Sequence, residues 1–317
     1  MLKLLITRNL PDPVIAKAQG IFDVTVRDDT APLSCDDLIQ SLTDYDVVLP
    51  TLGDIYSADI FDAVPEPRAG LLANFGVGYN HIDAQAAKAA GIKVTNTPGA
   101  VTEATADIAL MLMLMTCRRA GEGERMVRAG TWTGWHPTQL LGLHMSGKTL
   151  GVVGMGRIGK AIAQRAHFGF GMKIRFYNRS PKELDFPAEQ IASLTELAAQ
   201  VDFLVIAVPG GPETRHLIDA EILHALKPHA HLVNIARGDV VKEDDLIAAL
   251  EAGHIAGAGL DVYEFEPDVP DALRNMENVT LLPHLGTAAL EVRTAMGMMA
   301  VDNAIAFSEG RALPNAV

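Results

Sequence analysis

The sequence predicts an α/β protein made of two domains, each built on a parallel sheet, and three observations lead to this class. Short apolar runs typical of strands alternate with helix-like segments along most of the 317 residues. A glycine-rich turn follows one of these strands near the middle of the chain. The length is generous for one hydrophobic core and comfortable for two. We therefore expect two doubly wound sheets with helices on their faces.

The first domain is expected to be flavodoxin-like. Pro13 opens and Gly20 closes its first expected helix, and Ser34 is a candidate N-cap for a second helix that reaches Leu42. A third helix is expected over residues 83–90. The expected strands are 2–6, 22–26, 46–50, 70–73 and 92–95. This alternation predicts a parallel sheet within residues 1–98.

A long helix and an irregular stretch come next. The helix is expected over residues 102–119 and is rich in leucine and methionine. Residues 121–145 have an irregular pattern and contain the only two tryptophans of the chain, Trp132 and Trp135. Because exposed tryptophans are rare, we expect this stretch to pack against a partner subunit.

The second domain is expected over residues 99–287. Its expected strands are 149–153, 173–177, 202–208, 231–236, 256–260 and 279–282. Six strands with intervening helices match a doubly wound nucleotide-binding fold. The last helical pattern, over residues 290–308, is expected to return to the first domain. That domain would then be discontinuous and consist of residues 1–98 and 288–317.

The glycine-rich turn has the spacing of a dinucleotide-binding motif and predicts a Rossmann domain. Gly154 permits the tight turn after a strand, Gly156 lets the backbone approach a pyrophosphate, and Gly159 lets the following helix pack closely. The N-terminus of that helix points unpaired N–H groups and a positive dipole end at the phosphates. The predicted cofactor loop also contains Met155, Arg157 and Ile158.

The end of the next strand indicates which nicotinamide cofactor binds. NAD-binding folds place an acidic side chain about 20 residues after the glycines, where it holds the ribose hydroxyls. Here the chain has Asn178, Arg179 and Ser180, with Lys182 close behind. A carboxylate would repel a 2'-phosphate, whereas a guanidinium fork and a hydroxyl accept one. We therefore expect NADPH/NADP to be preferred over NADH/NAD; the alternative is a solvated basic turn.

Charged and imidazole side chains follow the last three strands. They are Arg237, then Asp261 and Glu266, then His284. Ligands of open parallel sheets bind outside the carboxyl ends of the strands, so these groups are expected to meet where the nicotinamide lies. Taken singly, Arg237 could cap a surface loop and His284 could be structural. Their common position at strand ends favours a catalytic site.

The sequence resembles the D-isomer-specific 2-hydroxyacid dehydrogenases over nearly its whole length. The segments that carry the similarity are NFGVGYNHID (74–83), GMGRIG (154–159), PETRHL (212–217), NIARG (234–238), GLDVY (259–263) and PHLG (283–286). Within this family the chain is most similar to the NADP-linked glyoxylate/hydroxypyruvate reductases. The resemblance implies two domains, a homodimer, and reduction of a small 2-oxo acid.

The resemblance also implies a role for each candidate residue. Arg237 would bind the substrate carboxylate and polarise the C2 carbonyl, and His284 would donate the proton as hydride arrives. Glu266 would fix the tautomer of His284 and favour its protonated form. Asp261 would hold the nicotinamide carboxamide. The other implied cofactor contacts are Val208, Pro209, Thr214, Ile235, Ala236 and Gly286.

Substrate size is less well specified. By resemblance, the N–H groups of Val77 and Gly78 would receive the substrate carboxylate; the alternative is a plain tight turn. The preceding Asn74 and Phe75 bring no positive charge for a phosphorylated substrate, so glyoxylate and hydroxypyruvate are favoured. Alternatives are a reductase of bulkier acids such as phenylpyruvate or hydroxyphenylpyruvate, and a nucleotide-sensing protein on the same scaffold. A phosphoglycerate dehydrogenase without its regulatory part is a weaker third.

Composition excludes several other classes. Hydrophobic residues make up 49% and charged residues 21% of the chain, which is typical of a packed globular protein. A net charge of −13 argues against a nucleic-acid partner. Two cysteines are too few for a disulfide framework or a metal site. The N-terminus reads as a strand and the longest apolar run is too short for a bilayer, so a soluble cytoplasmic protein with no membrane partner is expected.

Overall fold

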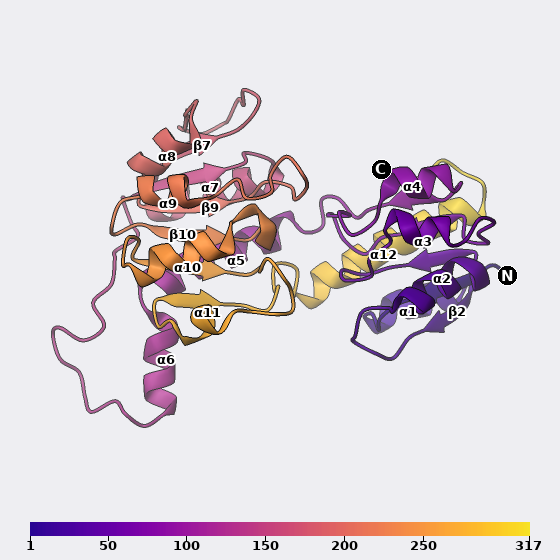
Figure 1. Cartoon of the computed structure of the whole chain (residues 1–317), viewed down its shortest axis with the longest axis horizontal. Coiled ribbons are helices and arrows are strands. Elements are labelled where there is room, and N and C mark those ends of the chain that lie inside the picture. The colour runs from indigo at the N-terminus through magenta and orange to yellow at the C-terminus, as the bar shows by residue number, and fades with distance from the viewer. The chain divides into compact units, whose positions relative to one another are not determined.

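A computed structural model describes residues 1–317 and divides the chain into two compact units. Unit 1 consists of Met1–Val101 and Thr287–Val317, and unit 2 consists of Thr102–Gly286. Each unit is a parallel sheet with helices on both faces (Figure 1). The predicted fold class, two doubly wound α/β domains, is confirmed.

The sheet of unit 1 has five parallel strands in the order β2-β1-β3-β4-β5. The strands are β1 (Lys3–Ile6), β2 (Asp23–Val26), β3 (Val47–Leu49), β4 (Leu71–Ala73) and β5 (Lys93–Thr95). The register places Leu4 of β1 opposite Val24 of β2 and Val47 of β3. This order is that of flavodoxin-like sheets, as predicted.

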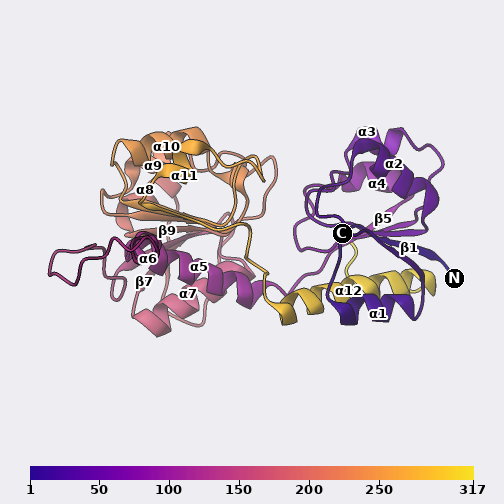
Figure 2. The same cartoon turned by 90° about the horizontal axis from the view of Figure 1, so that it is seen from below.

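Five helices cover the two faces of this sheet (Figure 2). One face carries α1 (Asp12–Gln19) and α12 (Leu290–Ser308), and the other carries α2 (Cys35–Asp44), α3 (Ala58–Asp62) and α4 (Ala84–Ala89). Ser34 caps α2 as predicted, because its hydroxyl accepts the Asp37 N–H while the Asp37 carboxylate accepts the Ser34 N–H. The C-terminal helix therefore completes the core that the first third of the chain begins.

The sheet of unit 2 has seven parallel strands in the order β12-β11-β10-β9-β6-β7-β8. The strands are β6 (Thr149–Val153), β7 (Lys173–Tyr177), β8 (Glu189–Gln190), β9 (Phe203–Ile206), β10 (His231–Asn234), β11 (Gly257–Leu260) and β12 (Val279–Leu281). The order reverses at β6, as in Rossmann domains. β8 exceeds the six expected strands; it has two exposed residues, too few to show an alternating pattern.

Helices also cover both faces of the second sheet (Figure 2). One face packs against α5 (Thr102–Cys117) and α7 (Arg157–Phe170). The other packs against α8 (Leu194–Gln200), α9 (Ala220–Ala225), α10 (Glu243–Glu251) and α11 (Asp271–Asn275). Side chains alternate along the buried strands: Leu204 and Ile206 face one layer and Phe203 and Val205 the other. No helix combines the length and apolarity needed to cross a membrane.

The stretch expected to be irregular contains a helix, α6 (Ala120–Arg128), so the prediction was wrong for those residues. None of its residues is buried, and Arg128 pairs with Glu124 one turn earlier. Gly121 and Gly123 lower helix propensity, and only Ala120, Met126 and Val127 of the segment are apolar. Figure 1 shows α6 and the following loop standing away from the sheet of unit 2.

Candidate functional site

The predicted site residues of unit 2 lie in loops that follow strands of one parallel sheet. The loop of Gly154–Gly159 follows β6, that of Asn178–Lys182 follows β7, and that of Val208–Thr214 follows β9. Arg237, Glu266 and His284 follow β10, β11 and β12, which are neighbours in the sheet. Because parallel strands end at the same edge, the fold gathers all of these loops there.

The three motif glycines differ in what they allow. Gly154 has φ +96°, and a Cβ there would lie 2.8 Å from Val208 Cγ1. A Cβ on Gly159 would lie 2.1 Å from the Gly154 carbonyl oxygen, so α7 packs against the turn as closely as the motif predicts. A Cβ on Gly156 would meet no atom within 4 Å, which leaves open space above that backbone.

The N-terminus of α7 fits an anionic group. Gly156 is its N-cap and supplies no side chain to cap the first N–H groups. These N–H groups and the helix dipole attract negative charge. Asn178, at the end of β7, accepts the Met155 N–H at 3.1 Å and so joins the glycine loop to the neighbouring strand. The residues present therefore fit the pyrophosphate of a dinucleotide. Asn178 was predicted only as a cofactor contact, and its hydrogen bond to the glycine loop was not expected.

The basic turn after β7 is ordered by Asn178. Its Nδ2 donates to the carbonyl oxygen of Ser180 at 2.8 Å and to Ser180 Oγ at 3.2 Å. Arg179 is exposed and forms an ion pair with Glu213 of the loop after β9. The sequence offered no sign of this partner, which lies 34 positions away. Lys182, further along the turn, is also exposed.

Glu266 and His284 form a hydrogen-bonded pair at the carboxyl edge of the sheet. His284 Nδ1 lies 2.8 Å from Glu266 Oε2, and the other carboxylate oxygen accepts the Tyr263 N–H at 3.1 Å. Burial acts to raise the pKa of Glu266, but the hydrogen bond and attraction of His284, the Tyr263 N–H and the positive charge of Arg237 together lower it. A carboxylate can only accept, so Nδ1 carries a proton and Nε2 is left to exchange one.

Arg237 is held in a tightly folded loop. Asn234 Nδ2 donates to the Arg237 carbonyl oxygen at 2.9 Å, and Asn234 Oδ1 accepts the Ala236 N–H at 3.0 Å. Burial lowers the pKa of the guanidinium, while the carboxylate of Glu266 opposes that change. A Cβ on Gly210 would lie 2.6 Å from Arg237 Cγ, so the glycine in this loop makes room for the arginine stem.

The remaining predicted contacts are parts of the same loops. Thr214 Oγ1 donates to the Pro209 carbonyl oxygen at 2.7 Å and closes the loop after β9. Ile235 and Ala236 are buried directly after β10. The Ala236 carbonyl oxygen accepts from Arg237 Nη1 at 2.7 Å, so this segment also helps to hold the arginine.

Asp261 is a buried carboxylate that shapes the histidine loop. It accepts the N–H groups of Leu285 at 2.6 Å and Gly286 at 2.8 Å, and its carbonyl oxygen accepts the His284 N–H at 3.0 Å. Burial raises its pKa, and these N–H groups and His284 oppose the rise. The position of His284 is therefore set by Asp261 through the backbone as well as by Glu266 through the ring.

The edge of unit 1 carries the other predicted residues, Val77 and Gly78. Asn74 Nδ2 donates to the carbonyl oxygens of Gly76 at 3.1 Å and Gly78 at 3.0 Å, and Asn96 Nδ2 donates to that of Val77 at 2.9 Å. The N–H groups of Val77 and Gly78 donate to no acceptor in the chain. With its carbonyl oxygens held by amides, this turn presents free donors to an anion.

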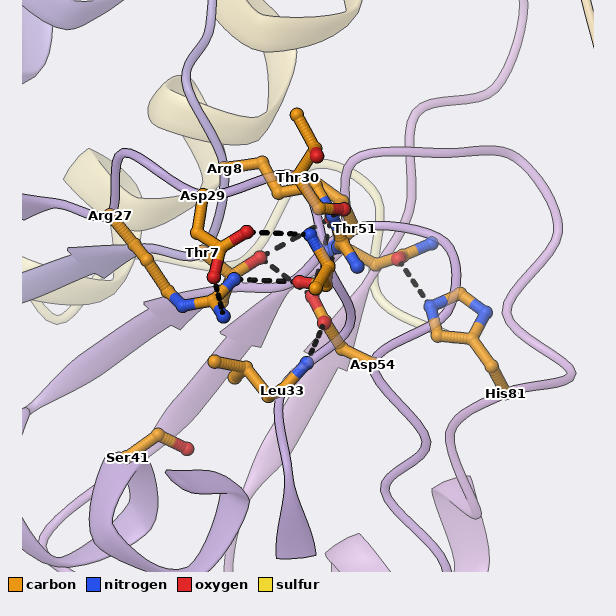
Figure 3. Close-up of polar contacts among 12 residues, drawn as sticks. Thr7, Arg8, Arg27, Asp29, Thr30, Leu33, Ser41, Thr51, Asp54 and His81 are labelled. Carbon is orange, nitrogen blue, oxygen red and sulfur yellow. Dashed lines mark hydrogen bonds and ion pairs between the residues drawn. The ribbon is translucent and has the colours of Figure 1, made fainter. Parts of the chain in front are cut away.

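A buried ion pair braces the same edge (Figure 3). Asp54 is fully buried and lies 3.0 Å from Arg8 Nη1. Its carboxylate also accepts the Thr7 hydroxyl at 2.6 Å and the N–H groups of Thr51 at 2.9 Å and Leu33 at 3.1 Å. The loops after β1 and β3 are thus joined at one carboxylate. Sequence reasoning missed this network because its members lie up to 47 positions apart.

Comparison with known proteins gives the family. The NAD-binding-domain model of the D-isomer-specific 2-hydroxyacid dehydrogenases matches residues 110–286. A glyoxylate reductase from Thermococcus onnurineus is 43% identical, over 99% of this chain and 95% of the relative. A glycerate dehydrogenase from Hyphomicrobium methylovorum is 39% identical, over 95% of this chain and 94% of the relative.

A solved structure agrees with these relatives. An NADPH-dependent glyoxylate/hydroxypyruvate reductase from Sinorhizobium meliloti, in complex with citrate, has a TM-score of 0.86 and 37% sequence identity. The comparison covers 100% of this chain and 98% of the other. The resemblance seen in the sequence is thereby confirmed, and the chain belongs to the family of D-isomer-specific 2-hydroxyacid dehydrogenases.

Proposed function

We propose that this protein is an NADPH-dependent reductase of small 2-oxo acids, converting glyoxylate to glycolate and hydroxypyruvate to D-glycerate. The observation that carries the proposal is the Glu266–His284 pair, at 2.8 Å, and the half-buried Arg237, in the loops that follow three neighbouring strands. This set combines a proton donor, its charge partner and a carboxylate-binding group. The names of the relatives, glyoxylate reductase and glycerate dehydrogenase, describe the two directions of this type of reaction.

The edge of unit 2 would hold the cofactor. The open backbone at Gly156 and the uncapped N-terminus of α7 suit its pyrophosphate, and the Asp261 carboxylate retains lone pairs for the carboxamide. When bound, the nicotinamide supplies the hydride. The protein's part is to orient the substrate carbonyl and manage its charge and proton.

The side chains of the site divide that work. Arg237 would bind the carboxylate of the oxo acid with its guanidinium fork, and the free N–H groups of Val77 and Gly78 are proposed to bind a carboxylate as well. His284 would donate its Nε2 proton to the carbonyl oxygen. Glu266 accepts the Nδ1 proton and so leaves Nε2 as the nitrogen that exchanges a proton with the substrate. The reverse reaction needs His284 without that proton.

The preference for NADPH rests on the turn after β7. Asn178 is neutral and already hydrogen-bonded to Ser180, so the end of β7 itself carries no carboxylate to repel a 2'-phosphate. Arg179 is exposed and able to turn toward such a phosphate. Its ion pair with Glu213 is exposed on both sides and is worth at most about 1 kcal/mol, a small obstacle to a phosphate carrying about two charges.

We also propose that the protein works as a homodimer. Trp132 and Trp135 have exposed fractions of 52% and 80%, and Val127 of α6 and Leu141 are exposed as well. Such a run of exposed apolar side chains, on the end of α6 and in the loop that follows it, is typical of a surface covered by a partner. The cytoplasmic location expected from the sequence stays a prediction.

The proposal is tested by measuring kcat/KM for NADPH and NADH with glyoxylate, hydroxypyruvate and phenylpyruvate. We expect high values for NADPH with the two small acids. Equal rates with NADH would contradict the cofactor preference, and faster reduction of phenylpyruvate would contradict the small substrate. Cofactor binding with no turnover of any acid would contradict the reductase itself and favour a nucleotide sensor.

A further inference from the structure

A second histidine–carboxylate pair lies behind the loops of the site. His216, in the loop between β9 and α9, places its Nε2 2.8 Å from Oε1 of Glu264, which follows β11. The Glu264 side chain is 9% exposed and that of His216 is 32% exposed. A carboxylate so deeply buried is costly unless donors surround it, so the imidazole N–H has a defined task.

Glu264 is also tied to the start of α10. Its Oε2 accepts the Glu243 N–H at 3.3 Å, and its own N–H donates to Glu243 Oε2 at 3.4 Å. Burial raises the pKa of Glu243, and the neighbouring charge of Glu264 adds to the rise. Two buried carboxylates in this reciprocal arrangement hold the backbone of the β11 loop against the helix.

The backbone next to His216 holds the arginine loop. The His216 N–H donates to the Asp239 carbonyl oxygen at 2.7 Å. A Cβ on Gly238 would lie 1.8 Å from the carbonyl carbon of Tyr263, so the residue after Arg237 lies directly against the residue before Glu264. The loops that carry Arg237 and Glu266 therefore meet at the His216–Glu264 pair.

The backbone of His216 has an unfavourable conformation. Its φ is +52°, in the left-handed region that is uncommon for residues other than glycine, although histidine, like asparagine and aspartate, occurs there more often than most. His284 has a similar φ of +54°. Such residues persist where surrounding contacts fix them, and they cluster at functional sites. A glycine would relieve the backbone but would remove the donor to Glu264.

We propose that His216 and Glu264 are positioning residues of the reductase. Through the turn 263–266, in which the Tyr263 N–H holds Glu266 Oε1, they keep Glu266 where it accepts from His284. Through the Asp239 and Gly238 backbone they also hold the loop of Arg237. The inference rests on the proposed function, since it assigns a task within that site.

The kinetic test compares His216→Ala with His216→Gln, whose side-chain amide can still donate to Glu264. We expect the alanine variant to lose about tenfold to hundredfold in kcat for glyoxylate, as small misplacements of catalytic groups do. The Kd for NADPH, measured by fluorescence, should stay nearly unchanged, and the glutamine variant should recover most of the rate. His224→Ala removes an exposed histidine of α9 and is the matched control. Unchanged kcat in His216→Ala, or no recovery in a folded His216→Gln, would overturn the proposal.

A second readout needs no turnover. In protein labelled with nitrogen-15 histidine, the hydrogen-bonded Nδ1 proton of His284 is identified by its absence from His284→Ala. We expect this signal to shift and exchange faster with water in His216→Ala and, if that variant fails to fold, in Glu264→Gln. An unchanged signal would overturn the positioning role. If the wild-type protein reduces no 2-oxo acid, the proposed function fails while this signal still decides the inference.

Discussion

Acid should weaken unit 2 through His231, which the fold keeps neutral. His231 begins β10, is 6% exposed and stacks on Phe203 with ring centroids 5.6 Å apart. Burial lowers its pKa to about 4 from an ordinary value of 6.5, and the neighbouring His229 adds to the shift. Its Nδ1 lies 3.2 Å from the Thr116 hydroxyl, a partner that needs no charge on the ring.

The sign of the effect follows from which state binds the proton. Between the ordinary pKa and the lowered one, the unfolded chain holds a proton on His231 that the folded chain lacks. The free energy of unfolding is therefore undiminished above pH 6.5, falls as the pH drops through the window, and levels off below about 4. Each pKa unit is worth about 1.4 kcal/mol, so the full loss is about 3 kcal/mol, of which about 2 kcal/mol has occurred by roughly pH 4.5.

Urea unfolding followed by circular dichroism, near pH 7 and near pH 4.5, measures this loss. His231→Asn keeps an acceptor for Thr116 but cannot titrate, and His136→Asn makes the same change at an exposed position. We expect the wild type and the His136 variant to lose about 2 kcal/mol more than the His231 variant. Equal losses in all three proteins would refute the argument.

Three further changes test the other features. Glu266→Gln should lower kcat for reduction about tenfold to hundredfold, because a hydrogen bond to a charged partner is worth about 1.5–3 kcal/mol; loss confined to KM would contradict its role beside His284. Because the Glu266 pKa is lowered, its stabilising contribution is present above the ordinary carboxyl pKa and disappears as the pH falls through the lowered value. Arg179→Ala should raise KM for NADPH about tenfold and leave KM for NADH unchanged. Glu213→Gln should lower KM for NADPH. Equal effects on both cofactors would rule out a 2'-phosphate contact. Asp54→Asn should cost about 3–5 kcal/mol of unfolding free energy, whereas Asp302→Asn, in an exposed pair, should cost less than about 1 kcal/mol; similar losses would show that the buried network is not special.

Most of the fold could be predicted because its signals are local. The Ser34 cap, the apolar run before Gly154 and the strands that follow are each visible within a few residues. The elements that were missed give weak signals: β8 has two exposed residues, α6 buries none of its residues, and α3 is five residues long with no side-chain cap. Few residues of α6 are apolar, so the pattern that predicts a packed helix is weak there.

The candidate site divides in the same way. Arg237, Glu266 and His284 could be singled out because parallel strands bring their ends to one edge, whatever the loop details. The residues that hold these loops could not be predicted. Asn96, for example, donates to the Val77 carbonyl oxygen from 19 positions away in the sequence. Such pairings depend on register and loop path, which adjacent residues do not encode.

The placement of the two tryptophans makes the protein's own fluorescence selective. Trp132 and Trp135 follow α6 and contribute to none of the four hydrophobic clusters, and the Trp132 indole N–H donates to Gln139, also in this segment. Tryptophan fluorescence therefore reports the surroundings of this one short segment and changes little when either sheet unfolds. A blue shift of the emission maximum that grows with protein concentration would signal burial of that segment. In a dilute sample, urea would unfold both hydrophobic cores with little change in the emission maximum.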